Sequence, residues 1–415
     1  MSLFILDYTK KILPSGMRII FRKMESPLVA LNLWAKVGAK DEQPEKNGIS
    51  HFFEHMVFKG TQSFPQNTLA RKVQALGGSI NAGTSLDTTN FYLVLPGEEW
   101  KTGISILAEL IGNPLFEVQD IEKEKLVVLQ EINIDEDSPE ERLIHLLYQE
   151  VFAGTAYGMP ILGKEETVRS FTREDLVEHK KRYYHSLNLS LVGAGNVEEE
   201  EFFYQAEKAF SEVPLPETFW TVQPSEWCLK TGKFYREAKD VQRFYGVIGF
   251  PCASLKSEDF YALRFVSVIL GEGIGSRLNV SLREEKQLVD AIHTSYSYYE
   301  RAGLFGIFYS FLKGDPLQVQ EAIWKEIDLL THSLSEIELE RARNLLKSSL
   351  YQVAETTLGS SELLGRLDAV DTADRVLHYF IHLESMQKDK IQEVIAKYFK
   401  LEHATHIVIC PEEVL

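Results

Sequence analysis

The chain has 415 residues, of which 44% are hydrophobic and 25% are charged, a balance typical of a globular protein with at least two domains. Its formal net charge of −17 excludes nucleic acid as the expected partner, because phosphate binding needs clustered lysine and arginine, but it permits basic peptides. The N-terminus lacks a basic start followed by an apolar core, and no 18-residue apolar run occurs. We therefore expect a cytoplasmic protein without membrane contact.

The cysteine content predicts free thiols. Cys228, Cys252 and Cys410 are too few and too scattered for a disulfide framework, and they lack the spacing of metal ligands. We expect buried thiols in a reducing compartment.

The first predicted elements are a strand over 28–37 and a helix over 49–58, and the helix carries His-Phe-Phe-Glu-His at 51–55. Residues four apart on a helix are stacked neighbours, so His51 and His55 can both bind one Zn²⁺ while Glu54 faces the ion without ligating it. A free carboxylate beside a metal-bound water is a general base, and the motif therefore indicates a metal-dependent hydrolase. The alternative is that two core or surface histidines share a helix by chance.

A helix over 68–76 and two strands over 80–85 and 88–95 follow. The strand residues alternate and include threonine, tyrosine, phenylalanine and valine, so they predict a hairpin beside the metal helix.

An amphipathic helix is predicted over 121–135. Glu124 and Glu131 lie seven residues apart in it, which is two turns, and therefore share one face. Either could supply the third protein ligand that a catalytic zinc needs. The pattern is weak by itself, because the chain has 61 acidic residues and such a pair more often marks a solvated face.

Three prolines interrupt the pattern over 212–224, so we expect an N-terminal domain over 1–212, a linker over 213–228 and a C-terminal domain over 229–415. The two halves are distantly alike, and the first ends with a strand over 187–192. The predicted second half contains strands over 244–250, 291–299, 304–311 and 406–410 and helices over 260–270 and 277–285. The helix over 260–270 has no histidine, so the second copy lacks the metal motif.

These residues resemble the pitrilysin-type (M16) metallopeptidases, known as inverzincins. The inverted motif at 51–55 is followed by Glu131 at the family's usual distance, and the segments 51–61, 77–85 and 157–163 resemble family signatures in family order. The similarity is to short two-domain members, such as the mitochondrial processing peptidase beta subunit and bacterial M16B peptidases. It implies an α+β fold of two homologous α/β domains, each a mainly antiparallel sheet covered by helices, facing another such chain across a cavity.

The resemblance also implies residue roles. His51, His55 and Glu131 would bind zinc, and Glu54 would be the base that deprotonates the zinc-bound water. Glu124 would support the site from the same helix as Glu131. The expected reaction is hydrolysis of peptide bonds in unfolded or extended peptides.

Substrate-binding residues follow from the same resemblance. The strand containing Asn81 and Ala82 would pair with an extended peptide, and most relatives have an aromatic residue where Gly83 stands. Phe58 resembles a residue that lines the pocket after the cleaved bond, although an ordinary core phenylalanine is equally compatible. Arg283 matches a substrate-binding arginine of the family.

The chain departs from the family seven residues after Arg283, where Asp290 replaces a tyrosine. Losing a donor to the oxyanion can cost about 10²–10³ in rate. We therefore expect a heterodimer in which a homologous subunit supplies the arginine–tyrosine pair. A homodimer is the competing state, in which Tyr296, Tyr298 or Tyr299 could compensate.

Two other classes of function were weighed. A non-catalytic scaffold or peptide-binding subunit with this fold is the main alternative, but such proteins usually have eroded metal motifs. An oxidoreductase or nucleotide enzyme is disfavoured, because the glycines at 271, 273 and 275 lack the dinucleotide-binding spacing.

Overall fold

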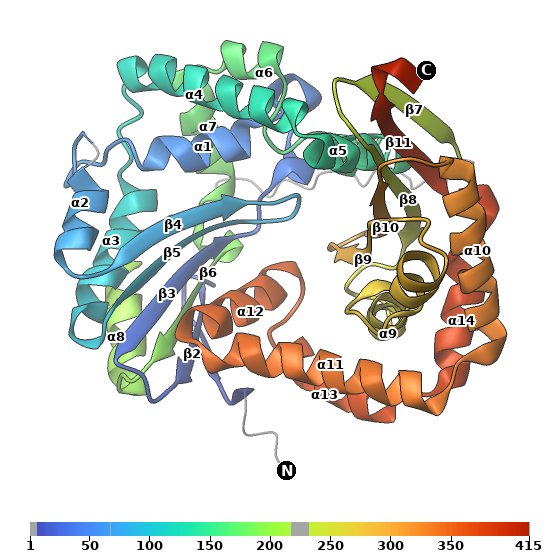
Figure 1. Ribbon diagram of the computed structural model, residues 1–415. Helices are drawn as coiled ribbons and strands as arrows, with labels where there is room; N and C mark the ends of the chain where they lie inside the picture. Colours follow the sequence, from blue (N-terminus) through green and yellow to red (C-terminus); the bar gives the residue numbers. More distant parts are fainter. Residues whose placement is uncertain (1–5, 67, 217–231, 415) are drawn as a thin grey trace. The chain divides into compact units, whose positions relative to one another are not determined.

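The computed structural model describes residues 6–66, 68–216 and 232–414 (Figure 1). The chain forms two compact units whose segments alternate along the sequence. The first unit comprises residues 1–133, 159–224 and 351–377, and the second comprises 134–158, 225–350 and 378–415. The boundaries of these units differ from the sequence-based division into two domains joined by one linker. Each half of the sequence contributes a helical segment to the unit that is built mainly from the other half. Most of the linker predicted over 213–228 lies outside the described residues.

The first unit contains a six-stranded sheet with the order β1-β2-β6-β3-β5-β4. All neighbouring strands are antiparallel except β2 and β6, which are parallel. The sheet therefore ends at β4, the strand expected beside the metal helix. The strands are β1 Thr9–Ile12, β2 Arg18–Lys23, β3 Leu28–Ala35, β4 Ser79–Thr84, β5 Thr89–Pro96 and β6 Leu189–Gly195.

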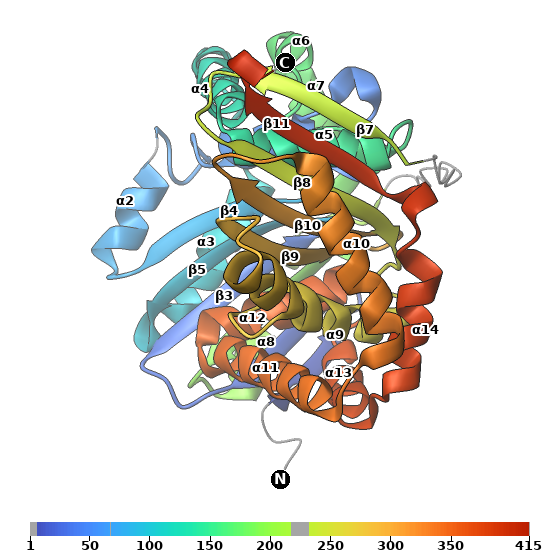
Figure 2. The ribbon, with the colours of Figure 1, turned by 45° about the vertical axis from the view of Figure 1, so that its right-hand side comes forward.

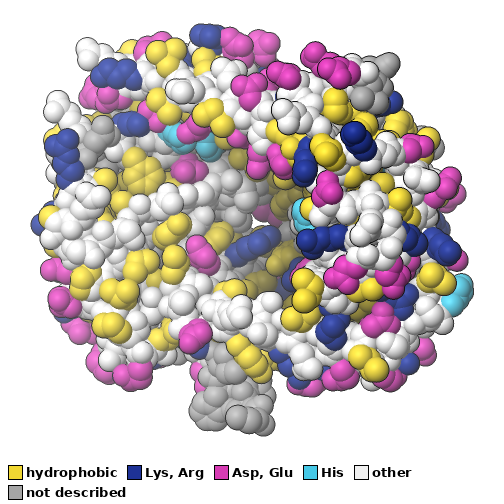
Figure 3. Space-filling model, viewed as in Figure 1, with side chains coloured by type: hydrophobic (Ala, Val, Ile, Leu, Met, Phe, Trp, Pro, Cys, Tyr) yellow, Lys and Arg dark blue, Asp and Glu magenta, His cyan; other side chains and the backbone are white. Residues whose placement is uncertain are grey.

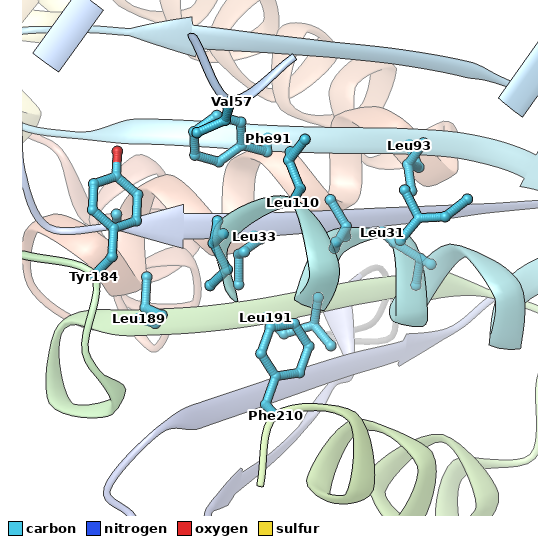
Figure 4. Close-up of a cluster of buried hydrophobic side chains, with 14 of the residues drawn as sticks. Leu31, Leu33, Val57, Phe91, Leu93, Leu110, Tyr184, Leu189, Leu191 and Phe210 are labelled. Atoms are coloured by element: carbon cyan, nitrogen blue, oxygen red, sulfur yellow. The ribbon is translucent and has the colours of Figure 1, made fainter. Parts of the chain in front are cut away.

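Helices cover both faces of this sheet (Figure 1). Alternate residues of β3 point to opposite faces, so Leu31 and Leu33 enter the main core while Trp34 faces the other side. The core is completed by residues of α1 (Ile49–Val57), α3 (Trp100–Gly112) and α8 (Glu199–Ala209). Figure 4 shows the leucines of β3 and β6 with Val57 of α1, Leu110 of α3 and Phe210, which follows α8.

The opposite face is covered by α12 (Thr357–Val370), which comes from the second half of the sequence. The helix approaches the sheet closely, because a Cβ at Gly365 would lie 2.0 Å from Nε1 of Trp34. The buried Asp368 carboxylate also pairs with Lys10 at 2.5 Å and with Arg18 at 2.6 Å. Close packing and buried ion pairs thus attach this distant segment to the first unit.

The second unit contains a five-stranded sheet with the order β7-β11-β8-β10-β9, visible in Figure 2. Gly249 of β8 contacts Leu147 of α5 (Pro139–Val151), whereas the adjacent Phe250 packs against Trp324 of α10 and Phe399, so helices cover both faces. The strands are β7 Phe234–Lys239, β8 Phe244–Cys252, β9 Ala291–Tyr298, β10 Gly303–Phe311 and β11 Thr405–Pro411. The helices are α9 Asp259–Gly271, α10 Pro316–Ser333 and α14 Lys388–Tyr398.

The predicted repeat is confirmed strand by strand. The order β2-β6-β3-β5-β4 corresponds to β7-β11-β8-β10-β9, and the first two strands of each series are parallel. A helix from the other half of the sequence packs on the third strand in both units, with Gly365 against Trp34 in one and Leu147 against Gly249 in the other. The expected α+β fold with two mainly antiparallel sheets is therefore confirmed.

Most predicted elements are present, with shifted ends. The helix expected over 121–135 is α4, which runs Val118–Asp137, and the strand expected from 187 begins at Leu189 after a short 3₁₀ turn. The helix expected over 277–285 is a π-helix over Asn279–Glu285. The remaining helices are α2 Thr68–Ala75, α6 Glu165–Ser170, α7 Arg173–Tyr183, α11 Glu336–Glu355 and α13 Arg375–Ser385.

Two expectations concern the whole chain. Among the described residues, no helix is both long and apolar enough to cross a membrane. Cys252 and Cys410 are buried free thiols, as predicted, and Cys228 lies outside the described residues.

Candidate metal centre and active site

The helix α1 is fixed at its beginning by a buried carboxylate. Glu42 accepts hydrogen bonds from the backbone N–H groups of Gly48 at 2.6 Å and Ser50 at 2.8 Å, and from the Asn47 side chain at 2.9 Å. Burial raises the pKa of Glu42 to about 7, although these donors oppose the shift. Two backbone N–H groups at the start of the helix are thus satisfied, which helps to hold it in place.

The apolar side of α1 is buried in the core of the first unit. Phe52, Phe53, Met56 and Val57 are completely shielded from solvent, and the Phe53 ring stacks on Tyr184 with centroids 4.3 Å apart. The opposite side of the helix carries both histidines and Glu54. The amphipathic pattern read from the sequence therefore sets the direction in which these polar groups point.

His51, His55 and Glu131 come together as a candidate metal site, with one ligand atom of each within 4.8 Å of the others. Oε2 of Glu131 lies 3.9 Å from Nε2 of His51 and 3.6 Å from Nε2 of His55. Ligands of one tetrahedral zinc, bound at about 2.0–2.2 Å, lie roughly 3.4 Å apart, so the three residues fit this ion with a small contraction. The site belongs entirely to the first unit.

Desolvation keeps His51 neutral. Burial, supported by repulsion from His55, lowers the pKa of His51 to about 3, so the imidazole can offer a lone pair at neutral pH. Its Nδ1 is buried without a hydrogen-bond partner among the described residues.

His55 is held by a carboxylate. Its Nδ1 lies 2.8 Å from Oε1 of Glu124, an arrangement that directs the lone pair of Nε2 toward Glu131. Burial opposes protonation of His55, but the hydrogen bond to Glu124 and the charges of Glu131 and Glu54 outweigh it and raise the pKa of His55.

Glu124 is buried, which excludes the solvated-face interpretation for this residue. Its second oxygen lies 2.6 Å from Nζ of Lys59. Burial raises the pKa of the carboxyl, but the bonds from His55 and Lys59 outweigh this effect, and the pKa of Glu124 is lowered. Lys59, His55 and Glu124 therefore form a connected chain in which Glu124 is ionised.

Glu54 lies beside the candidate metal ligands. Its Oε2 accepts a hydrogen bond of 2.6 Å from Oγ1 of Thr84, the last residue of β4. Burial raises the pKa of Glu54, opposed by the Thr84 hydroxyl and the charge of His55. A carboxylate with a raised pKa is suited to accepting a proton and donating it later.

The strand β4 lies at the edge of its sheet, so its outer main-chain groups have no strand partner among the described residues. Asn81 is exposed on it, and its Oδ1 accepts the N–H of Ala82 at 2.9 Å. Ala82 is half-buried against the core. These features leave an edge that an added peptide strand could pair with.

Phe58 follows α1 directly and is partly buried against the core, with its ring centroid 6.2 Å from that of Phe91. It therefore has a packing role as well as a partly accessible surface. Arg283 belongs to the second unit, where it is exposed and makes no hydrogen bond or ion pair with the residues described.

Asp290, which stands where the family has a tyrosine, and two nearby tyrosines make polar contacts within the second unit. Asp290 lies 3.5 Å from Arg243, and the buried Tyr296 donates its hydroxyl to the Ala253 carbonyl at 2.5 Å. The Tyr299 hydroxyl lies 2.6 Å from that of Tyr148. Tyr296 is therefore a poor substitute for the absent phenol.

Three supporting residues were missed in the sequence: Glu42, Lys59 and Thr84. Lys59 stands four residues after His55, so helical spacing could have indicated it. Thr84 lies within the predicted strand, but nothing in the alternation pairs it with Glu54. Glu42 has no local signal, because its role depends on a turn that folds back onto the helix.

The fold and the site together define a protein with a helix-borne His/His/Glu centre next to a free sheet edge, and comparisons identify its family. The family model for insulinase (peptidase family M16) matches residues 18–165, and the model for the peptidase M16 inactive domain matches residues 170–346. An uncharacterized zinc protease of Rickettsia bellii is 33% identical, with 82% of each chain aligned. The chain therefore belongs to peptidase family M16.

Two further comparisons agree. A probable mitochondrial-processing peptidase subunit beta of Arabidopsis thaliana is 30% identical over 89% of this chain and 75% of that protein. The crystal structure of a protease from Helicobacter pylori, 20% identical, has the same fold, with a TM-score of 0.93 over 98% of this chain and 100% of that one. Zinc is the cofactor of this family, and several relatives are named zinc proteases.

Proposed function

We propose that this chain is a zinc-dependent endopeptidase that cleaves unfolded or extended peptides as the zinc-bearing subunit of a dimer. The observation that carries the proposal is the convergence of His51, His55 and Glu131, whose ligand atoms lie within 4.8 Å of one another beside Glu54. Three protein ligands are the number that a catalytic zinc takes when it keeps one position open.

The chemistry follows from the groups around this position. Zinc, when bound, lowers the pKa of a water ligand from about 15.7 to about 7 and polarises the scissile carbonyl. Glu54 takes the proton of the attacking water and returns it to the leaving amine. Glu124, ionised between Lys59 and His55, accepts a hydrogen bond from Nδ1 of His55 and so favours the tautomer whose Nε2 can bind the ion.

The edge strand supports the substrate class. An extended peptide can pair with the free edge of β4, whose last residue contacts Glu54, so that a bond of the peptide is presented to the base. A folded substrate is disfavoured, because its backbone groups are already paired. Acidic and basic side chains are interspersed over the face shown in Figure 3, which favours a charge distribution serving solubility over one that selects basic peptides.

Residues of the second unit support the proposal of a dimer. Arg283 is exposed and unpaired among the described residues, and the position of the family's tyrosine holds Asp290, whose partner is Arg243. A carboxylate would repel a developing oxyanion rather than stabilise it. We therefore propose that a homologous subunit supplies the arginine–tyrosine pair, with a homodimer as the competing state.

The experiment combines zinc analysis with cleavage of a mixed peptide library. The wild type, Glu54→Gln and the matched control Glu122→Gln are each assayed with and without the product of any adjacent homologous gene. Glu122 lies on α4 but pairs with Lys125, away from the ligands. We expect about one zinc per chain, bound by His51, His55 and Glu131, and cleavage only in the mixture, lost in Glu54→Gln and kept in the control.

Asp290 favours a second candidate, a non-catalytic scaffold or peptide-binding subunit. A chain that binds no zinc and cleaves nothing with any partner would establish this function. Full cleavage by the purified chain alone would instead show that a homodimer tolerates Asp290, and would contradict the heterodimer.

A further inference from the structure

The proposed base is held by a single side chain. Among the described residues, Oε2 of Glu54 accepts one hydrogen bond, from Oγ1 of Thr84 at 2.6 Å, and Oε1 of the same carboxylate accepts none. The two oxygens therefore differ: one is fixed by the sheet, and the other is left for a ligand.

The strand end that carries Thr84 is well anchored. Thr84 pairs with Thr89 of β5, whose hydroxyl donates to the Val37 carbonyl at 2.9 Å. The turn that follows is closed by the Ser85 N–H, which donates to the Thr88 carbonyl at 2.8 Å, and by the Ser85 hydroxyl, 3.0 Å from that carbonyl. A β-branched side chain on such a strand has few rotamers, so the direction of the Thr84 hydroxyl is well defined.

The position of β4 at the sheet edge means that this hydrogen bond also connects the base to the proposed peptide-binding strand. The strand that holds Glu54 is the same edge strand that is free to pair with a peptide. The base and a peptide paired with β4 would therefore be held by the same strand. A peptide bond at a given position along β4 would lie at a fixed distance from the Glu54 carboxylate.

We propose that Thr84 is a positioning residue that orients Glu54, holding Oε2 so that Oε1 is directed at the attacking water. This inference rests on the proposed function. The hydroxyl donates to Oε2, so Oε1 stays available to accept the proton of the attacking water. A shift of about 1 Å in a reacting group can cost 10²-fold in rate, so one lost contact at this point is enough to matter.

The kinetic test uses Thr84→Val, which keeps the shape but removes the hydroxyl, and Thr84→Ser, which keeps the hydroxyl. Ser105→Ala is the control, because Ser105 is exposed on α3 and its hydroxyl donates to the Lys101 carbonyl of the same helix at 3.1 Å. With the complex that cleaves peptides, we expect Thr84→Val to lower kcat about 10- to 100-fold at unchanged KM and zinc content. Thr84→Ser should restore most of kcat, and the control should match the wild type.

The structural test does not need activity. Crystal structures of the zinc-loaded wild type and both Thr84 variants should show the Glu54 carboxylate displaced in Thr84→Val and retained in Thr84→Ser. An unmoved carboxylate in Thr84→Val, or a wild-type kcat, would overturn the role of Thr84 without affecting the proposed function. Absence of cleavage by the wild type would refute the proposed function, while the crystal structures would still decide the role of Thr84.

Discussion

Nδ1 of His55 lies 2.8 Å from Oε1 of Glu124, and this contact links a candidate metal ligand on α1 to a buried carboxylate on α4. Glu131, the third candidate ligand, stands seven residues later on α4. The helix therefore contributes both a metal ligand and the group that orients another.

Replacing Glu124 should weaken zinc binding. In Glu124→Gln the charge that holds the His55 tautomer is lost, so we expect zinc affinity to fall about 10- to 100-fold, measured by competition with a chromophoric chelator. Glu122→Gln, on the same helix, is the control and should bind zinc like the wild type. Equal affinity in Glu124→Gln would show that the contact has no influence on the metal.

Removing Lys59 should have a related but smaller effect. In Lys59→Met the apolar stem is kept, but the Glu124 carboxylate loses its cationic partner at 2.6 Å. We expect zinc affinity to fall less than in Glu124→Gln, because the contact to His55 survives. A double variant measured with the same chelator should show non-additive losses, since the two residues act through one carboxylate.

Zinc should stabilise the chain through its ligands. At a free zinc concentration 100 times the Kd, the free energy of unfolding should rise by about 2.7 kcal/mol, and chelation should remove this gain. In thermal unfolding experiments, His51→Ala should show no zinc-dependent shift in Tm. A zinc-dependent shift that persists in this variant would place the ion elsewhere.

The stability should decline in acid partly because of His179. This residue of α7 packs against Phe53 of the metal helix, with ring centroids 5.3 Å apart, and burial lowers its pKa to about 3. Its pKa in the unfolded chain is about 6.5, so the unfolded state gains a proton first as the pH falls. The stabilisation is present above pH 6.5 and is lost between pH 6.5 and about 3, at up to about 1.4 kcal/mol per pH unit.

The matching variant is His179→Phe, which fills the site without a titrating group. The difference in unfolding free energy between wild type and variant, measured by urea unfolding at pH 7 and at pH 5, should shift in favour of the variant at pH 5. A constant difference would mean that His179 does not titrate on unfolding in this range.

The packing of α12 on the sheet predicts the effect of adding one methyl group. Gly365→Ala should destabilise the protein by about 1–3 kcal/mol, because the new Cβ would lie 2.0 Å from Nε1 of Trp34. Gly112→Ala is the control, since no atom lies within 4 Å of its Cβ position. Chemical denaturation of both variants would check this, and equal stabilities would mean that α12 can move away without cost.

The sequence was sufficient to predict those features that depend on the geometry of a single helix or strand. Helical spacing placed His51, Glu54 and His55 on one side of α1, and a separation of seven residues placed Glu124 and Glu131 on one side of α4. Alternation predicted β4 and β5, and similar element orders revealed the repeat. These patterns depend on the 3.6-residue and two-residue periods, which are properties of the backbone itself.

Only the tertiary structure decided what the side chains contact. The residues that support the site, Glu42 and Thr84, reach α1 from a preceding turn and from a sheet edge, and no periodicity links them to it. The exchange of α5 and α12 between the halves was equally hidden, because an amphipathic helix shows that it must be buried but not against which sheet. The sequence by itself thus determined which groups could serve as ligands and base, whereas long-range packing decided how each of them is held.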